Sequence, residues 1–283
     1  MKSFFSLVKF SHTIFALPFA LVGASLGFQQ QHDFQWKTLF WILGCMITAR
    51  NAAMAFNRYI DRKYDTANPR TWVREIPAGI ISPKVALLFV VVNSILFSFF
   101  SWCISELCFY LSPIALAVIL GYSYTKRITW LCHFFLGIGL GLAPVGAYVA
   151  VVDSFSWMIV LLGFTVMLWV SGFDIIYALQ DIGFDKEHNL NSIPAYFGLQ
   201  KALFISRGLH IGCLLGLMIF TYQIEAGWLS WTATGLFAML LGYQHQVVGK
   251  GDLSRVNLAF FTTNGIASVV FGGLIVLDLF TFT

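Results

Sequence analysis

The sequence predicts an all-α membrane protein, a polytopic bundle of about nine transmembrane helices. Of its 283 residues, 58% are hydrophobic and only 11% are charged, whereas soluble domains carry about 25% charged residues. Long apolar runs recur along the chain, and basic residues collect in alternate loops. The runs are too long for membrane β-strands and do not alternate as such strands do. No Pro-rich or low-complexity linker divides the chain, so we expect one membrane domain over residues 1–283.

The apolar runs supply the predicted helices in order. A bilayer span needs about 20 predominantly apolar residues. We expect the first run to be a retained helix rather than a cleaved signal peptide, because many more runs follow it. The predicted spans are residues 10–28, 39–58, 85–104, 108–124, 133–150, 156–180, 201–221, 226–246 and 256–279. Only a few residues separate the third and fourth runs, so eight spans are the alternative.

The loops between these runs predict the orientation in the membrane. Short cytoplasmic loops are enriched in Lys and Arg. With nine spans and the N-terminus inside, all of the 17 Lys and Arg residues except Lys37 fall on the cytoplasmic side. The long polar loops at about 61–83 and 181–200 then face the cytoplasm. We therefore expect the functional site at that face.

The second run continues into the polar segment "FNRYIDRKYDTANPRT". Its residues Asn57, Asp61 and Asp65 are four apart, a spacing that places side chains on one face of a helix. Magnesium prefers oxygen ligands and often takes one or two carboxylates together with substrate phosphates. The segment is thus either a magnesium site or a solvated helix end whose acids pair with the neighbouring basic residues.

The sixth run continues into "YALQDIGFDKEH", where Asp181 and Asp185 repeat the spacing and Tyr177 precedes them by one turn. A solvated helix end is again the alternative. Asp174 lies deeper in the run, where an acid is costly and suggests function, although a hydrogen-bonded structural role fits equally well. The two acid motifs lie four spans apart on one predicted face. We therefore expect two similar halves around a central cavity, in which two magnesium ions bridging a diphosphate would balance four carboxylates.

Basic and aromatic residues accompany both motifs. Lys126 and Arg127 end the segment "GYSYTKR", one turn after Tyr122, and Arg70 and Arg74 lie in the first acidic loop. Basic side chains of this kind bind phosphate oxygens, and an aromatic face stabilises a nearby cation. The alternative is that they anchor the helices at the membrane surface.

Arg50 differs from these residues because it lies within the second span, about two turns before Asn57. A buried arginine suits a carboxylate, which is either that of a substrate or an internal acid such as Asp174. The five cysteines and six histidines show no metal-ligand spacing, and we expect the histidines to be packing or interfacial residues. Basic residues form no stripe with interleaved aromatic residues, which argues against nucleic-acid binding. Glycines in the fifth span, Gly141 among them, predict either close helix packing or a kink.

Together the motifs resemble those of the UbiA superfamily of intramembrane aromatic prenyltransferases, over nearly the whole chain. The first motif resembles the family's Asn-x-x-x-Asp-x-x-x-Asp signature, "DIGFD" its second Asp motif, and "YSYTK" its Tyr-x-x-x-Lys element. The chain looks most like the 4-hydroxybenzoate polyprenyltransferase group. "ARNAAMAFNRYIDRKYD" and "GYSYTKRITW" resemble a branch linked to menaquinone made through futalosine. In one departure, Arg58 stands where the family often has Asp.

The resemblance implies transfer of a polyprenyl group from polyprenyl diphosphate to 4-hydroxybenzoate or a dihydroxynaphthoate, in ubiquinone or menaquinone biosynthesis. It implies a bacterial inner membrane location, a lipid environment and no obligate protein partner. Magnesium would be held by Asp61, Asp65, Asp181 and Asp185, with Tyr122 and Lys126 as further catalytic residues. The implied substrate-binding residues are Asn57, Arg50, Arg70, Arg74, Arg127, Tyr177 and Asp174. The alternatives are a polytopic transporter of an anionic solute and another lipid-forming transferase of the UbiA type.

Overall fold

The protein is described by a computed structural model that covers Leu7, residues 15–249 and residues 255–281. Within these ranges all regular structure is helical, which confirms the predicted all-α class. Residues 10–14 of the first predicted span lie outside the described residues. The helices form two compact units. Among the described residues, the first unit comprises Leu7 and residues 36–124, and the second comprises residues 15–35, 125–249 and 255–281.

Seven helical stretches of the described chain are long and apolar enough to cross a membrane. They are Trp36–Ala67, Pro83–Ile104, Glu106–Thr125, Cys132–Val152, Trp157–Glu187, Leu199–Gln223 and Leu258–Thr281. The two other predicted runs also contain helices, α2 (Leu17–Gln31) and α11 (Trp228–Val248), but neither is among the seven. A multi-pass membrane protein is therefore confirmed, whereas nine spans and two similar halves stay predictions.

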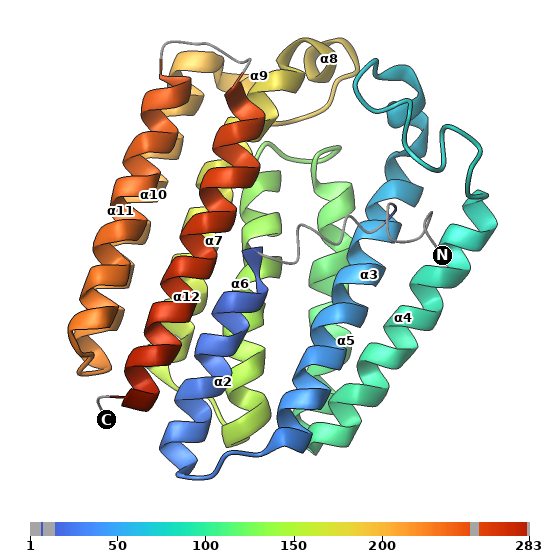
Figure 1. Cartoon of the computed structure of the whole chain (residues 1–283). Coiled ribbons are helices and arrows are strands. Elements are labelled where there is room, and N and C mark those ends of the chain that lie inside the picture. The colour runs from blue at the N-terminus through green and yellow to red at the C-terminus, as the bar shows by residue number, and fades with distance from the viewer. Residues whose placement is uncertain (1–6, 8–14, 250–254, 282–283) are drawn as a thin grey trace. The chain divides into compact units, whose positions relative to one another are not determined.

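The first unit consists mainly of α3 (Trp36–Ala67), α4 (Pro83–Ile104) and α5 (Glu106–Thr125), with α3 packed along α4 (Figure 1). Helix α3 has 32 residues, so at 1.5 Å per residue it is about 48 Å long. The hydrocarbon core of a bilayer is only about 30 Å thick. The helix therefore continues well past its apolar stretch, and its last turns carry the first acid motif.

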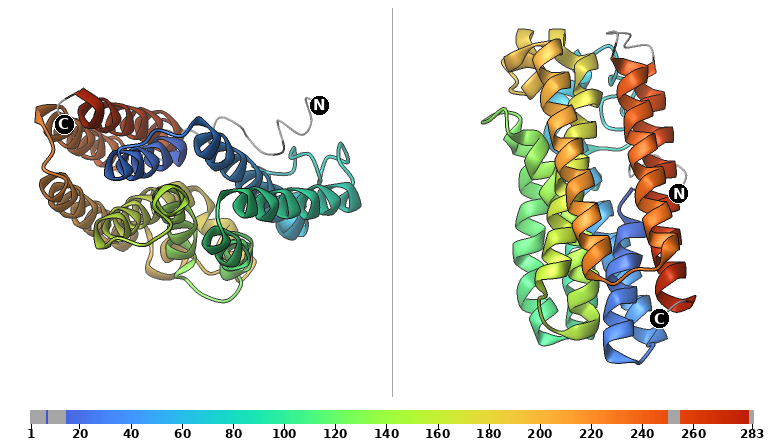
Figure 2. Two further views of the ribbon diagram at one scale, coloured as in Figure 1. Left: turned by 90° about the horizontal axis from the view of Figure 1, so that it is seen from below. Right: turned by 90° about the vertical axis from the view of Figure 1, so that its left-hand side faces the viewer.

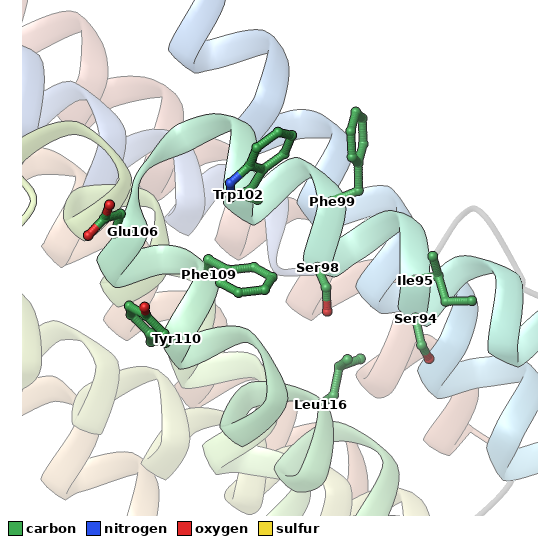
Figure 3. A pocket seen from close by; sticks show the side chains of 9 residues that line it. All are labelled: Ser94, Ile95, Ser98, Phe99, Trp102, Glu106, Phe109, Tyr110 and Leu116. Carbon is green, nitrogen blue, oxygen red and sulfur yellow. The ribbon is translucent and has the colours of Figure 1, made fainter.

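A groove of about 630 Å³ lies between α4 and α5 in the first unit (Figure 3). A hydrogen bond of 3.1 Å between the Ser98 and Ser112 hydroxyls joins the two helices beside it. Its lining is mostly apolar and comprises Ser94, Ile95, Ser98, Phe99, Trp102, Glu106, Phe109, Tyr110 and Leu116. None of the predicted site residues contributes to this groove.

The second unit is a ring of long helices in which each helix packs against two neighbours (Figure 2). Around the ring the order is α7, α6, α2, α12, α11 and α10, and α10 closes the ring on α7. The helices not yet delimited are α6 (Cys132–Val152), α7 (Trp157–Ala178), α10 (Leu199–Gln223) and α12 (Asn264–Thr281). Most of these contacts join helices that follow one another in the chain. The exceptions are the contacts of α2 with α6 and with α12. Helices α7 and α10 also meet, although short elements separate them in the chain.

Aromatic side chains form the core of this ring. Trp169 on α7 is fully buried, and its ring centroid lies 5.2 Å from that of Phe19, 5.0 Å from Phe173 and 5.5 Å from Phe237. Its indole N–H donates a 3.1 Å hydrogen bond to the Asn264 side chain. A buried indole needs such an acceptor, so the largest core residue is both packed and satisfied.

Glycines allow the closest approaches between helices of the second unit. A Cβ built on Gly141 of α6 would lie 2.5 Å from the carbonyl oxygen of Gly163 on α7. A Cβ on Gly23 of α2 would lie 2.1 Å from the carbonyl oxygen of Pro144 on α6. Both distances are shorter than any real contact, so the predicted packing role of Gly141 is confirmed.

Beyond α7 the chain changes direction through short elements. A 3-10 turn, η2 (Leu179–Asp181), leads to α8 (Ile182–Glu187), and a loop then leads to α9 (Ile193–Phe197). Ser192 caps α9 by accepting the N–H of Ala195 at 3.2 Å, with Pro194 in the first turn. These short elements carry the second acid motif.

Candidate active site

The first acid motif occupies one face of α3, as its spacing predicts. The Asn57 side-chain amide donates a 3.0 Å hydrogen bond to an oxygen of Asp61. Asn57 and Asp61 are both half-buried, whereas Asp65, one turn further, is only 5% exposed. The face therefore presents oxygen atoms in a row from the membrane span into the last turns of the helix.

Asp65 pairs with a basic residue from the following loop. Arg74 Nη1 lies 2.6 Å from Asp65 Oδ1, and the Thr71 hydroxyl donates to the Asp65 carbonyl at 3.2 Å. Asp65 Oδ2 is buried, and no described residue donates a hydrogen bond to it. The loop is thus folded back over the motif, and Asp65 pairs with Arg74 rather than with a basic residue adjacent in sequence.

The other arginines near this motif have different surroundings. Arg62 donates to the Tyr59 carbonyl at 2.6 Å, and its guanidinium lies 4.4 Å from the Tyr59 ring centroid. Arg58 is only 3% exposed, and its Nε and Nη1 have no hydrogen-bond partner among the described residues. Arg70 is exposed, and its backbone N–H donates to the Asn68 side chain at 2.9 Å.

Arg50 and Tyr122 lie near each other within the first unit. Arg50 is half-buried on α3, and Tyr122 is half-buried on α5. The phenol of Tyr122 interacts electrostatically with the guanidinium groups of both Arg50 and Arg58. These residues therefore place positive charge beside an aromatic side chain, and their roles in substrate binding stay predictions.

The second acid motif is divided between two short elements. Asp181 ends the 3-10 turn and is half-buried, whereas Asp185 on α8 is fully buried. Lys126 Nζ lies 2.7 Å from Asp185 Oδ1, and the Ser192 hydroxyl donates to Asp185 Oδ2 at 2.9 Å. Their spacing predicts that both acids lie on one α-helix. In the structure Asp185 lies within α8, whereas Asp181 ends the 3-10 turn and is the N-cap of α8.

Lys126 connects this motif to the loop that follows α5. Its carbonyl oxygen accepts the N–H of Asn191 at 2.7 Å, so both its backbone and its side chain contact the segment around α8. Burial by itself lowers the pKa of the Lys126 ammonium, but the charge and hydrogen bond of Asp185 outweigh burial and raise that pKa. Lys126 is therefore a permanent cation at neutral pH, while the adjacent Arg127 is exposed.

Asp174 forms a hydrogen bond with a partner that the sequence did not predict. His133 Nδ1 on α6 lies 2.6 Å from Asp174 Oδ2 on α7. Because 41 residues separate them and no spacing links them, His133 reads from sequence as an ordinary packing residue. One turn after Asp174, the Tyr177 ring lies 4.2 Å from that of Phe260, centroid to centroid. Asp174 and Tyr177 thus belong to a polar and aromatic part of the second unit.

The donor atoms of the first motif fit magnesium. No group of three or more His, Cys, Asp or Glu side chains forms a metal site by itself in the described part of the chain. The paired Asn57 and Asp61 and the buried, unpartnered Asp65 Oδ2 nevertheless supply hard oxygen atoms. Magnesium usually takes few protein carboxylates and completes its coordination with phosphates and water, so these residues suit such an ion.

Known proteins resemble this chain over most of its length. A family model described as the UbiA prenyltransferase family matches residues 16–266. The 4-hydroxybenzoate octaprenyltransferase of Tolumonas auensis is 29% identical over 231 residues, which are 80% of this chain and 78% of that protein. The protein of the same name from an Enterobacter species is 29% identical over 226 residues, with the same two coverages.

Solved structures show the same fold. The apo structure of a UbiA homolog from Aeropyrum pernix K1 has a TM-score of 0.86 and 31% identity, and the match covers 94% of this chain and 98% of that one. A UbiA homolog from Archaeoglobus fulgidus bound to GPP and Mg2+ has a TM-score of 0.73 over 98% of this chain and 99% of that one. At 17% identity, the second likeness concerns the fold alone.

Proposed function

Because the chain belongs to the UbiA prenyltransferase family and is a prenyltransferase, we propose that it transfers a polyprenyl group from polyprenyl diphosphate to an aromatic hydroxy acid. The acceptor is 4-hydroxybenzoate or a dihydroxynaphthoate, and the product is a precursor of ubiquinone or menaquinone. The names of the curated relatives support an aromatic acid as acceptor. The placement of basic residues supports a site at the cytoplasmic face of a bacterial inner membrane.

One observation carries this proposal. Each acid motif ends in a buried carboxylate that is paired with a basic side chain: Arg74 lies 2.6 Å from Asp65, and Lys126 lies 2.7 Å from Asp185. Oxygen ligands for magnesium and cations for phosphate therefore stand side by side in both motifs. A magnesium-bound diphosphate needs both kinds of group, whereas a metal site alone would not need the cations.

The acids of both motifs would hold magnesium, with Asn57 assisting Asp61 and Asp65 in the first motif and with Asp181 and Asp185 forming the second. When bound, magnesium would neutralise the diphosphate and so make it a better leaving group. The chain's own cations act on the same charge. Lys126, Arg74, Arg70 and Arg127 bind phosphate oxygens and stabilise the charge that develops as the allylic C–O bond opens.

The remaining site residues serve the organic part of the reaction. Tyr122 shields the allylic cation through its aromatic face. Arg50, beside Tyr122 in the first unit, binds the carboxylate of the acceptor. Tyr177 and Asp174 contact the acceptor ring and its hydroxyl. The ring carbon next to the hydroxyl attacks the allylic cation as diphosphate departs, and that carbon then loses its hydrogen as a proton.

The experiment uses the purified protein in lipid nanodiscs with magnesium and a polyprenyl diphosphate. Each of 4-hydroxybenzoate and 1,4-dihydroxy-6-naphthoate is supplied in turn, and prenylated product and released diphosphate are both measured. We expect product with one acceptor, and none after Asp61→Asn or Asp181→Asn. Asp153→Asn is the matched control, because Asp153 is an exposed acid outside both motifs and asparagine tolerates its positive φ of 56°.

Two results would contradict the proposal. The first is absence of transfer to either acceptor by the unmodified protein, which would remove the quinone-precursor function. The second is undiminished transfer by Asp61→Asn or Asp181→Asn, which would remove the assigned role of the motifs. Removal of magnesium with a chelator should abolish transfer reversibly, and titration of manganese by electron paramagnetic resonance reports binding independently of turnover.

A further inference from the structure

His133 and Asp174 form a pair of which the reaction described above uses only Asp174, as a contact of the acceptor, and gives His133 no role. His133 is 2% exposed and lies at the start of α6, whereas the Asp174 side chain is 21% exposed near the end of α7. Their contact of 2.6 Å joins the two helices. An acid within a membrane-spanning helix is costly and usually has a function. We therefore expect the pair to do more than pack the two helices together.

The hydrogen bonds of His133 indicate where its proton lies. The backbone N–H of Ile193 donates to Nε2 at 3.3 Å, so that nitrogen carries the lone pair. A neutral imidazole with its lone pair on Nε2 has its proton on Nδ1, and Nδ1 faces Asp174. His133 is therefore a hydrogen-bond donor to the Asp174 carboxylate, and both of its ring nitrogens are occupied.

The two members of the pair differ in accessibility. His133 is almost fully buried, and the Ser171 hydroxyl also donates to its backbone carbonyl oxygen at 3.2 Å. Asp174 has the exposed end of the pair and is one turn from Tyr177, whose ring packs on Phe260. A carboxylate that accepts a hydrogen bond from a buried imidazole and is itself partly exposed can receive a proton from a bound molecule.

We propose that Asp174 is the general base that accepts the proton of the acceptor's phenolic hydroxyl, and that His133 is the positioning residue that holds its carboxylate. The inference rests on the proposed function, since it concerns the aromatic acceptor of that reaction. A phenol ionises only near pH 10, while a phenolate ring is the stronger carbon nucleophile. A base beside the hydroxyl therefore accelerates attack by the adjacent ring carbon.

The step balances without any further reagent. Asp174 takes the phenolic proton as the ring carbon bonds to the allylic carbon and the allylic C–O bond breaks, which releases diphosphate. The ring is then a neutral ketone that still carries a hydrogen on the newly bonded carbon. Loss of that hydrogen as a proton to water or diphosphate, with return of the proton from Asp174 to the ring oxygen, restores the aromatic phenol.

The alternative is that the pair only ties α6, α7 and the start of α9 together. An acceptor whose hydroxyl ionises more readily distinguishes a general base from a purely structural pair. 3-Fluoro-4-hydroxybenzoate is such a probe, since fluorine favours ionisation and one ortho carbon stays open. A missing base matters less for this acceptor, whereas a structural defect affects both acceptors equally. The ratio of variant to unmodified enzyme cancels the effect of fluorine on the ring itself.

The variants are Asp174→Asn, His133→Leu and His133→Asn, all in full-length protein in nanodiscs. Asparagine at position 133 keeps a donor close to the place of Nδ1 and is the conservative rescue. With 4-hydroxybenzoate we expect Asp174→Asn to lower kcat by about 100-fold, and His133→Leu to lower it less. With the fluorinated acceptor both deficits should shrink by about tenfold, and His133→Asn should retain most of the activity with either acceptor.

Equal deficits with the two acceptors in Asp174→Asn, or no deficit at all, would overturn the inference. If His133→Leu does not fold, Asp174→Asn and His133→Asn still decide, because each keeps the shape of the site. Failure of the unmodified enzyme to prenylate either acceptor would overturn the proposed function itself. An active enzyme with equal deficits overturns only the role of the pair, so the two failures are distinguishable.

Discussion

The pair of Lys126 and Asp185 offers the most direct test of the energetics of the site. Asp185 is fully buried, and its two oxygens are bound by Lys126 at 2.7 Å and by the Ser192 hydroxyl at 2.9 Å. Substituting Lys126→Met keeps the length and most of the apolar volume of the side chain but removes the charge. The variant therefore leaves a buried carboxylate with only a hydroxyl as partner.

The magnitude follows from the burial of the two partners. Breaking a buried ion pair by removing one member costs about 3–5 kcal/mol, since the other charge stays desolvated. The Lys126 side chain is 35% exposed, so water screens part of the interaction. We therefore expect Lys126→Met to lower the free energy of unfolding by about 2–3 kcal/mol, at or just below the lower limit of that range.

The assay is reversible unfolding in mixed micelles at increasing sodium dodecyl sulfate, followed by circular dichroism. The double variant Lys126→Met/Asp185→Asn should recover most of the loss, because it no longer buries an unpaired charge and asparagine can still accept from Ser192. Arg127→Met, at the adjacent exposed residue, is the matched control and should change stability by less than about 0.5 kcal/mol. The reasoning is refuted if Lys126→Met is as stable as the control, or if the double variant is no more stable than the single one.

Three further predictions concern stability. The pKa of Lys126 is raised above its ordinary value of 10.5, so the stability that its charge contributes is complete below pH 10.5 and should be lost as pH rises through the raised pKa. The free energy of unfolding, measured at increasing alkaline pH for the unmodified protein and for Lys126→Met, tests this loss. Arg74→Met should destabilise by about 2–4 kcal/mol, because Asp65 is buried beside it, and should also weaken retention of inorganic diphosphate in equilibrium dialysis; unchanged values of both would contradict its role. Gly23→Ala should destabilise by about 1–3 kcal/mol because its Cβ would overlap a carbonyl on α6, whereas Gly146→Ala, which meets no atom within 4 Å, should be tolerated in the same micelle assay.

The ion pairs also show that the four acids of the two motifs are not equivalent. Read as spacing alone, the four acids are equivalent oxygen ligands. In the structure Asp65 and Asp185 are buried and bound to basic residues, whereas Asp61 and Asp181 are half-buried. Each motif therefore has an inner acid that anchors a cation and an outer acid that is more accessible. The outer acids are accordingly the ones whose substitution tests the metal role most directly.

The all-α membrane class and the location of both acid motifs were predictable from the sequence alone. Apolar runs of about 20 residues report directly on helices in a membrane, and a spacing of four reports on one helix face. Both signals are local, so they survive without knowledge of the fold. The spacing predicts that Asn57 and Asp61 share one helix face, and the hydrogen bond between them on α3 agrees with that prediction.

Other features depended on packing. The helix α3 continues nine residues past the end of the predicted span at residue 58, because helices can extend beyond the apolar stretch that hydropathy detects. The 3-10 turn that ends at Asp181, just before α8, is likewise not detected by a spacing rule, because the spacing of residues does not distinguish a 3-10 turn from an α-helix. Both differences affect how the motifs are oriented rather than whether they exist.

The partners of the site residues were decided only by the tertiary structure. Asp65 is bound by Arg74 from a folded-back loop, Asp185 by Lys126 from a distant helix end, and Asp174 by His133 from the neighbouring helix. A sequence shows which residues carry charge, but an ion pair requires two side chains to be brought within about 4 Å in a medium that screens them weakly. That proximity is produced by the packing of α6, α7 and the connecting loops. The sequence therefore predicted the chemistry of the single residues but not which of them form pairs.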